Sequence, residues 1–257
     1  MDNPVVDTLA EEFHVASRNA AAFKRIYKAY EVHYEPFVQQ LVATAPLHLA
    51  DYPRVELPAH GASVHMSLGE AIKRRASGRG FSSVTLSVAA LAELLRLANG
   101  IHTIIRSEDQ PVFYRRPAAN SGGLGSVEIF PIILNVDGVE PGIYHFDSVR
   151  LDLARLYPGN FREWLREVIL FQVEFSEAAV ALVLTSAVGR LRAKYGLRGY
   201  RFALLDVGHV SQNIYLVSTG LGLQVCATAG FIDDELDAVL GLDGLDNASM
   251  LVVLVGP

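Results

Sequence analysis

The stretch from Lys194 to Gly220, KYGLRGYRFALLDVGHVSQNIYLVSTG, decides the fold class of this chain. Apolar residues recur in it at three- and four-residue spacing, which predicts one long helix with a single buried stripe that ends at Gly220. The predicted stripe consists of Leu204, Leu205, Val207, Val210, Ile214 and Val217. A helix of this kind needs another apolar layer to cover its stripe.

Strand patterns on both sides of this helix supply such a layer. Apolar, β-branched runs predict buried strands at 127–136, 142–146, 178–187, 223–228 and 249–255. Pro131 interrupts the first of them, and because proline lacks the amide for a ladder bond we expect a sheet edge or a bulge there. Residues 161–171 and 233–240 read as helices. Strands and helices alternate only loosely, with hairpins among them, so the pattern predicts an α+β fold.

Two further helices are marked by their ends. Ser67 and Glu70 form a capping box, in which the Ser67 hydroxyl accepts from the first turn and Glu70 returns to the Ser67 amide. Ser87 is the expected N-cap of a second helix, and Asn99-Gly100 predicts a left-handed cap at its end. Residues 1–60 carry many aromatic residues and prolines. We predict an N-terminal helical extension there, packed on a main domain of residues 61–257.

Bulk composition excludes several classes of protein. The chain has 257 residues, of which 51% are hydrophobic, and a formal net charge of −6, which gives no reason to expect nucleic acid as a partner. Its single cysteine, Cys226, lies in an apolar run and excludes a disulfide framework. No histidines pair at metal-ligand spacing, so we expect no metal site. The most apolar run, 178–189, is too short to span a bilayer, so we expect no membrane contact and a cytoplasmic location.

A first cluster of chemically active residues lies in 73–81, KRRASGRGF. Arg75 and Arg79 offer planar paired donors that match phosphate oxygens, and Ser77 adds a hydroxyl. From the residues alone, a solvated basic helix end explains this cluster at least as well.

A second segment, NSGGLGS at 120–126, is rich in glycine and enters a predicted strand. Such a loop can place backbone amides against a phosphate or a flat ring. It lacks the lysine of a P-loop, so by itself an ordinary flexible loop is the simpler interpretation.

The third segment is the polar stretch before the long helix. Lys194 and Tyr195 are adjacent candidates for proton transfer, and each needs burial or a cationic neighbour to act as a base near neutral pH. Arg198 and Arg201 are candidates to supply that field or to hold an anion. Because neighbours on an extended chain point to opposite sides, the two side chains need not contact the same atom, and the sequence leaves open which of them is the base. A polar loop with solvated cations is the alternative.

In their order and spacing these three segments resemble the SagB-type dehydrogenase family, a branch of the nitroreductase superfamily. The similarity begins at Glu12-Phe13-His14 and includes Arg-x-Ser-x-Arg-x-Phe at 75–81 and PGIYHF at 141–146. Its most specific part, 194–213, is similar to the dehydrogenase subunits of microcin-type thiazole/oxazole synthetases.

The resemblance implies a nitroreductase-like fold, with a mixed or antiparallel central sheet flanked by helices and FMN at a homodimer interface. Lys194 and Tyr195 become the implied catalytic pair. The implied FMN contacts are Arg75, Ser77 and Arg79 for the phosphate, and Asn120, Ser121, Gly122, Gly123, Arg198 and Gly230 elsewhere.

The implied reaction is oxidation of a thiazoline or oxazoline in a ribosomally made peptide, with a cyclodehydratase as partner. Departures from the family pattern occur at Ala76, where a second arginine is usual, and at Gly125-Ser126, where Tyr-Pro is usual. Ala76 leaves open the alternative of a catalytically silent scaffold subunit. The other alternative is an NAD(P)H-dependent nitro or quinone reductase of the same fold, against which the Lys194-Tyr195 pair argues.

Overall fold

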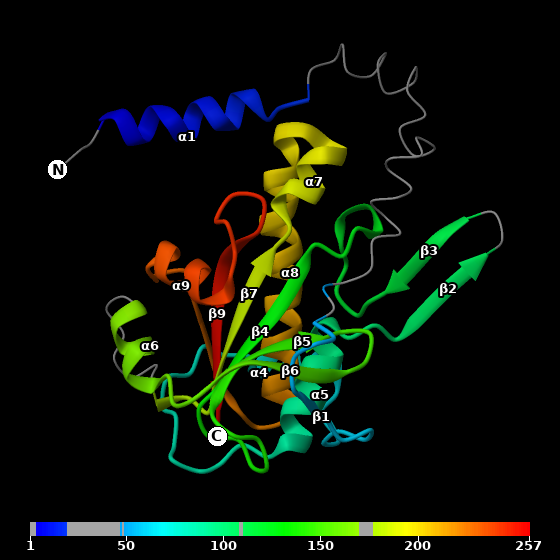
Figure 1. The fold of residues 1–257 in the computed structure, drawn as a ribbon, viewed down its shortest axis with the longest axis vertical. Helices are drawn as coiled ribbons and strands as arrows, with labels where there is room; N and C mark the ends of the chain where they lie inside the picture. The colour runs from blue at the N-terminus through cyan, green and yellow to red at the C-terminus, as the bar shows by residue number, and fades with distance from the viewer. Residues whose placement is uncertain (1–3, 20–46, 48, 108–109, 170–176) are drawn as a thin grey trace.

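Seven strands form one antiparallel sheet in the computed structural model of the protein, in the order β1-β6-β5-β4-β7-β9-β8 (Figure 1). The structure describes residues 4–19, 47, 49–107, 110–169 and 177–257. A separate hairpin consists of two strands. The strands are β1 (Arg54–Glu56), β2 (Thr103–Ser107), β3 (Gln110–Arg115), β4 (Val127–Ile133), β5 (Gly142–Asp147), β6 (Asp152–Pro158), β7 (Val180–Ser186), β8 (Gln224–Thr228) and β9 (Ala248–Gly256).

Helices cover both faces of the sheet, because alternate residues of its central strands are apolar on both sides. Ile129 and Leu182 pack in one layer with the helices α5 (Val88–Asn99) and α8 (Gly199–Gly220). Phe130 and Val183 pack on the opposite face with α6 (Arg162–Val168) and α9 (Asp233–Leu240). The period of two along a strand places neighbouring residues on opposite faces. The α+β prediction is therefore confirmed.

The predicted long helix is α8, and its last residue is Gly220 as expected. Val207, Val210 and Ile214 form its buried stripe. The prediction is wrong for Leu204 and Leu205, whose exposed fractions are 50% and 55%. Successive helix residues are 100° apart, and Ala203 and Asp206 occupy the buried face at this end instead.

Serine caps begin two helices as the sequence predicts. Ser67 Oγ accepts from Glu70 N before α4 (Leu68–Arg74), and Ser87 Oγ accepts from Ala90 N before α5. The Glu70 carboxylate, however, pairs with Arg74 at 3.1 Å and does not return to the Ser67 amide. Such a pair four residues apart satisfies the carboxylate within the helix surface.

The expected left-handed cap after α5 is wrong, because Gly100 is extended, with φ −66° and ψ 145°. Glycine is needed here for space: a Cβ would lie 2.8 Å from Arg96 O and 3.0 Å from a Leu151 methyl group. The Asn99 amide donates to Val127 O at 2.9 Å and ties the helix end to β4.

Pro131 lies inside the sheet, so the expectation of an edge strand is wrong. Its strand β4 pairs along its whole length with β7, but its pairing with β5 covers only Ile132 and Ile133. At Pro131 the strand therefore has a partner on one side alone, which leaves room for a residue without an amide hydrogen.

At the N-terminal end, α1 (Pro4–Ala16) lies beyond α7 (Val188–Tyr195), away from the sheet (Figure 1). Residues 20–46, nearly half of the predicted extension, lie outside the described part of the chain. Strand β1 joins the main sheet beside β6, and Arg54 pairs there with Asp147 at 2.9 Å. The division of the chain at residue 60 stays a prediction. In the described residues no helix is both long and apolar enough for a bilayer.

Candidate functional site

Lys194 and Tyr195 converge on the glycine-rich loop. Lys194 Nζ donates to Gly122 O at 3.4 Å. A Cβ built on Gly122 would lie 2.7 Å from Lys194 Nζ and would overlap the Tyr195 hydroxyl. Gly122 also has a φ of 61°, which disfavours any side chain there. Two segments that the sequence singled out separately therefore meet, and glycine is required at their contact.

A short helix, absent from the sequence prediction, sets the direction of these two side chains. Both residues lie in the last turn of α7, whose Val188 and Leu191 are buried against Leu124 and Ala203. The Tyr195 ring packs edge-on against Phe202, with the centroids 4.8 Å apart. The chain is helical here and not extended, and the two neighbouring side chains meet at one residue, Gly122.

Lys194 is partly buried, and burial lowers the pKa of its ammonium group. Desolvation penalises the charged form of a lysine, so the neutral amine is present at a lower pH than in a free lysine. Its Nζ also lies 5.3 Å from the centroid of the Tyr195 ring. The amine is thus prepared to accept a proton without help from a neighbouring arginine.

The two arginines proposed to supply that field instead hold the N-terminal helix. Arg198 Nη1 donates to Ser17 O at 3.1 Å. Arg201 Nε donates to Ser17 Oγ at 2.8 Å, and its Nη2 donates to His14 O at 2.6 Å. Both guanidinium groups therefore stabilise the end of α1. The role of Arg198 as a cofactor contact stays a prediction.

Asp206, a residue that the sequence analysis missed, anchors the glycine-rich loop. Its side chain is buried, and it accepts hydrogen bonds from Ser121 N at 3.0 Å, Ser121 Oγ at 2.7 Å and Ser126 Oγ at 3.0 Å. Asn120 Oδ1 accepts from Gly125 N at 3.2 Å within the same loop. The Asn120 and Ser121 side chains, together with the amides of Ser121 and Gly125, thus hold the loop in place. Gly123, with a φ of 73°, follows directly.

The cationic segment after α4 runs along β8 and faces the other end of α8. Gly78 N donates to Val225 O at 2.9 Å. Ser77 Oγ lies 3.1 Å from the Tyr215 hydroxyl, and the Arg75 guanidinium lies 5.5 Å from the centroid of that ring. Arg79 is exposed. Two guanidinium groups and a hydroxyl are thus held near the surface on a fixed backbone, a donor set that suits a phosphate.

The predicted catalytic pair, Lys194 and Tyr195, and the cationic segment lie near opposite ends of one helix. Tyr195 precedes the first residue of α8, Gly199, and Ser77 contacts Tyr215. At 1.5 Å per residue, Gly199 and Tyr215 are about 24 Å apart along the helix axis. Gly230, the remaining predicted contact, donates from its amide to Thr228 Oγ1 at 3.0 Å just after β8, and its role as a cofactor contact stays a prediction.

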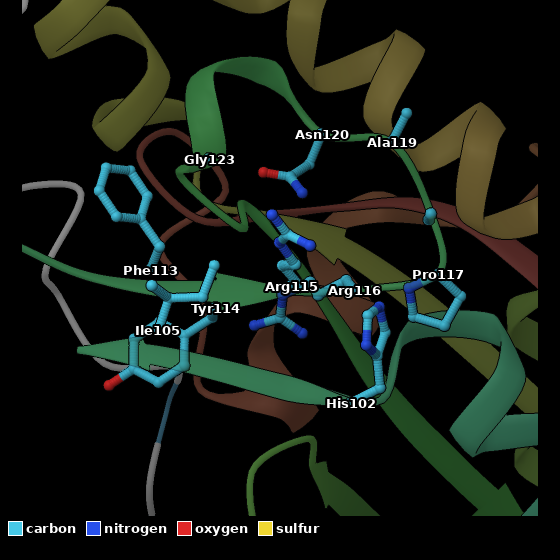
Figure 2. A pocket seen from close by; sticks show the side chains of 11 residues that line it. His102, Ile105, Phe113, Tyr114, Arg115, Arg116, Pro117, Ala119, Asn120 and Gly123 are labelled. Atoms are coloured by element: carbon cyan, nitrogen blue, oxygen red, sulfur yellow. The ribbon is translucent and has the colours of Figure 1, made fainter. Parts of the chain in front are cut away.

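A cleft of about 630 Å³ opens between the β2–β3 hairpin and the glycine-rich loop (Figure 2). Asn120 lies on its loop side and His102 on its hairpin side. The residues that line it are His102, Ile105, Phe113, Tyr114, Arg115, Arg116, Pro117, Ala118, Ala119, Asn120 and Gly123. The hairpin was not predicted, since the sequence indicated only a polar loop there.

A buried network of charged side chains supports the glycine-rich loop. Arg116 Nη1 donates to Asn99 O at 2.9 Å, and Arg190 Nη1 donates to Leu124 O at 3.0 Å. Burial lowers the pKa of both guanidinium groups, and the Glu128 carboxylate acts against that shift. Glu128 is itself held by His145 Nε2 at 3.0 Å. Within the described residues no group of three histidine, cysteine or acidic side chains could hold a metal ion.

The nitroreductase family model matches residues 72–256, which is more than half of the chain. The chain belongs to the nitroreductase family. The predicted nitroreductase-like fold is thereby confirmed.

Two family members give the sequence comparison. A protein of Methanocaldococcus jannaschii that carries a nitroreductase name is 30% identical over 175 residues, which are 68% of this chain and 84% of that protein. The microcin B17-processing protein McbC of Escherichia coli is 28% identical over 155 residues, which are 58% of this chain and 57% of McbC. This second match agrees with the predicted kinship to microcin-type dehydrogenases.

Solved structures of the family give the same fold. A protein of Anabaena variabilis with a nitroreductase name superposes with a TM-score of 0.68 and 25% identity over 80% of this chain, but over only 42% of its own. The E. coli microcin synthetase McbBCD complex, with truncated pro-MccB17 bound, gives 0.58 and 22% over 100% of this chain and 94% of the matched one. An Exiguobacterium sibiricum structure in complex with FMN, also with a nitroreductase name, gives 0.51 and 14% over 76% of this chain and 89% of its own.

Proposed function

We propose that the protein is an FMN-dependent dehydrogenase that oxidises thiazoline or oxazoline rings to thiazoles or oxazoles in a ribosomally made peptide. The observation that carries the proposal is the convergence of Lys194 Nζ and the Tyr195 hydroxyl on Gly122. A reductase that only relays hydride has no need of two proton-transfer groups at one place. The similarity to McbC supports the same choice.

Two parts of the chain have residues that fit an FMN cofactor, one for its phosphate and one for its flavin ring. Arg75, Ser77 and Arg79 would hold its phosphate, because their donors are planar or short and lie near the surface. The backbone of Gly122 and Gly123 would lie against its flat ring, since neither residue carries a Cβ. Bound FMN supplies the hydride acceptor of the reaction.

The chain itself contributes proton transfer and orientation. Oxidation of an azoline removes a hydride and a proton from the ring, and the proton needs a base. The Lys194 amine, whose pKa is lowered by burial, is suited to accept it. The Tyr195 hydroxyl, whose ring packs against Phe202, would orient the azoline ring. The remaining alternative is that Tyr195 is the base and Lys194 orients the azoline ring.

The proposal includes a homodimer and a cyclodehydratase partner. One protomer holds the cationic segment and the catalytic pair near opposite ends of α8. Two copies packed antiparallel along α8 would bring the cationic segment of one beside the catalytic pair of the other. A cyclodehydratase would supply the azoline, because an azoline forms by loss of water from a cysteine, serine or threonine and its preceding carbonyl.

The test is oxidation of a synthetic azoline peptide by purified enzyme that contains FMN. Lys194→Ala and Tyr195→Phe should keep FMN and lose roughly 10²–10⁴-fold in rate, as is typical for a positioned base. Arg192→Ala is the matched control, since Arg192 is an exposed cation on the same helix. Wild-type rates in both site variants would contradict the proposal.

A nitro or quinone reductase is the second candidate, favoured by the identity to the M. jannaschii protein. It would reduce its flavin with NAD(P)H, and that half-reaction should survive both substitutions. The same purified variants therefore separate the two functions. A scaffold subunit would show neither activity in the wild type.

A further inference from the structure

The cleft between the β2–β3 hairpin and the glycine-rich loop has no role in the proton transfer described above. It is continuous with the catalytic pair, because Gly123 lines the cleft and the preceding residue, Gly122, touches Lys194 and Tyr195. Consecutive Cα atoms are about 3.8 Å apart. A chain lying in the cleft would therefore reach the catalytic pair within one or two of its own residues.

Positive charge collects in this cleft, although the whole chain has a net charge of −6. His102, Arg115 and Arg116 line it, and none of its described lining residues is acidic. Arg115 forms no ion pair with a carboxylate of the described residues. The charge of Arg116 is offset in part by Glu128, so Arg115 is the cation available to a ligand.

A buried donor in the same cleft also lacks a partner. Arg116 Nε is shielded from solvent and makes no hydrogen bond within the described chain, although Nη1 of the same side chain donates to Asn99 O. Nε lies close to Gly125 under the glycine-rich loop, so the Arg116 guanidinium supports the loop and leaves contact with a ligand to Arg115.

Apolar side chains complete the walls of the cleft. Ile105 and Phe113 lie on neighbouring strands of the hairpin in direct register, and about a third of each side chain is exposed. Apolar walls of this kind suit the side chains of an extended peptide. The positive charge in the cleft suits a negatively charged side chain of that peptide.

We infer that this cleft binds the peptide segment that flanks the oxidised ring, and that it selects a carboxylate side chain within a few residues of that ring. The inference rests on the proposed function, because it names a preference of the same site. The occupant is an acidic peptide, and Arg115 is the residue that reads its charge.

The experiment compares peptides that carry Asp, Asn or Lys beside the azoline. The Asp peptide should exceed the Lys peptide by about tenfold in kcat/KM, the value of one charge-assisted contact. In Arg115→Glu this ratio should fall to one or below. Arg106→Glu is the matched control, because Arg106 is exposed on the same hairpin but does not line the cleft, and it should keep the wild-type ratio.

A binding measurement separates this inference from the proposed function. Labelled linear peptides without an azoline, studied by fluorescence anisotropy, should show the same Asp-over-Lys preference and the same loss in Arg115→Glu. An intact preference without any azoline oxidation would overturn only the proposed function. Equal binding of all three peptides would overturn the cleft assignment. Loss of FMN from Arg115→Glu, or full displacement of the Asp peptide by inorganic phosphate, would also overturn it, since the cleft would then be a phosphate site.

Discussion

Lys194 joins two properties that rarely occur together in a surface lysine. Its amine is partly buried, which lowers its pKa, and it donates to the backbone carbonyl of a glycine whose conformation leaves no room for a side chain. A lysine held in this way loses its proton more readily and has a fixed position. Both properties are what a general base requires.

The lowered pKa of Lys194 predicts the pH dependence of the reaction. The neutral amine is the active form of the base, so kcat/KM for azoline oxidation should rise with pH through the pKa of Lys194 and then level off. Because burial lowers that pKa, the rise should end at a lower pH than for an ordinary lysine. A pH profile of Lys194→Ala should lack this rise. An identical rise in the variant would assign it to another group, with Tyr195 as the first to test.

Residue types together with the family resemblance named the residues of the candidate site but not those that support it. Lys194, Tyr195 and Gly122 were identified from sequence, and the structure brings them together. Asp206 was missed because it lies within the apolar stripe of a helix, where a buried acid is not expected. Only the partners of its carboxylate, Ser121 and Ser126, reveal its role.

Between elements, Asp206 is the link that holds the glycine-rich loop on α8. In Asp206→Ala the amide and hydroxyl of Ser121 and the hydroxyl of Ser126 would lose their acceptor in a buried place. We predict a loss of roughly 2–4 kcal/mol in the free energy of unfolding, measured by urea denaturation. The matched control is Asp234→Ala on the exposed first turn of α9, which should cost less than about 1 kcal/mol. Equal losses in both variants would count against the anchoring role.

Elements whose apolar residues recur with a clear period were predicted from sequence. Elements in which charged and apolar residues are mixed without such a period were not. The end of α8 and the serine caps of α4 and α5 follow local rules that need no tertiary contact. The hairpin β2–β3 and the helix α7 alternate charged and apolar residues without a clean period, and they owe their form to neighbours. Gly100 shows the same limit, because crowding by Arg96 and Leu151 requires glycine there, not a left-handed turn.

At the scale of the whole molecule, an apolar surface near the start of α8 remains exposed in the described part of the single chain. Leu197, Tyr200, Leu204 and Leu205 gather around the start of α8 with exposed fractions of 51%, 40%, 50% and 55%. Contiguous exposed apolar residues of this size indicate an interface. These side chains lie beside the proposed catalytic pair, where the antiparallel packing of two copies would need an interface. The misplacement of Leu204 and Leu205 in the predicted buried stripe has the same origin, since sequence alone does not distinguish a core from an interface.

This surface predicts how assembly and cofactor binding depend on each other. The wild-type protein should sediment as a dimer that retains FMN. In the double variant Leu204→Glu and Leu205→Glu, the two new carboxylates would be buried without partners. The dissociation constant of the dimer should then rise by at least about 100-fold, and FMN should be released when the dimer dissociates. Leu245→Glu is the matched control, since Leu245 is 75% exposed in the turn after α9, and it should stay a dimer with FMN bound. Sedimentation velocity monitored at the flavin absorbance reports both the assembly state and the binding of FMN. A double variant that sediments as a yellow monomer would contradict a cofactor site shared between two copies, because each protomer would then hold FMN by itself.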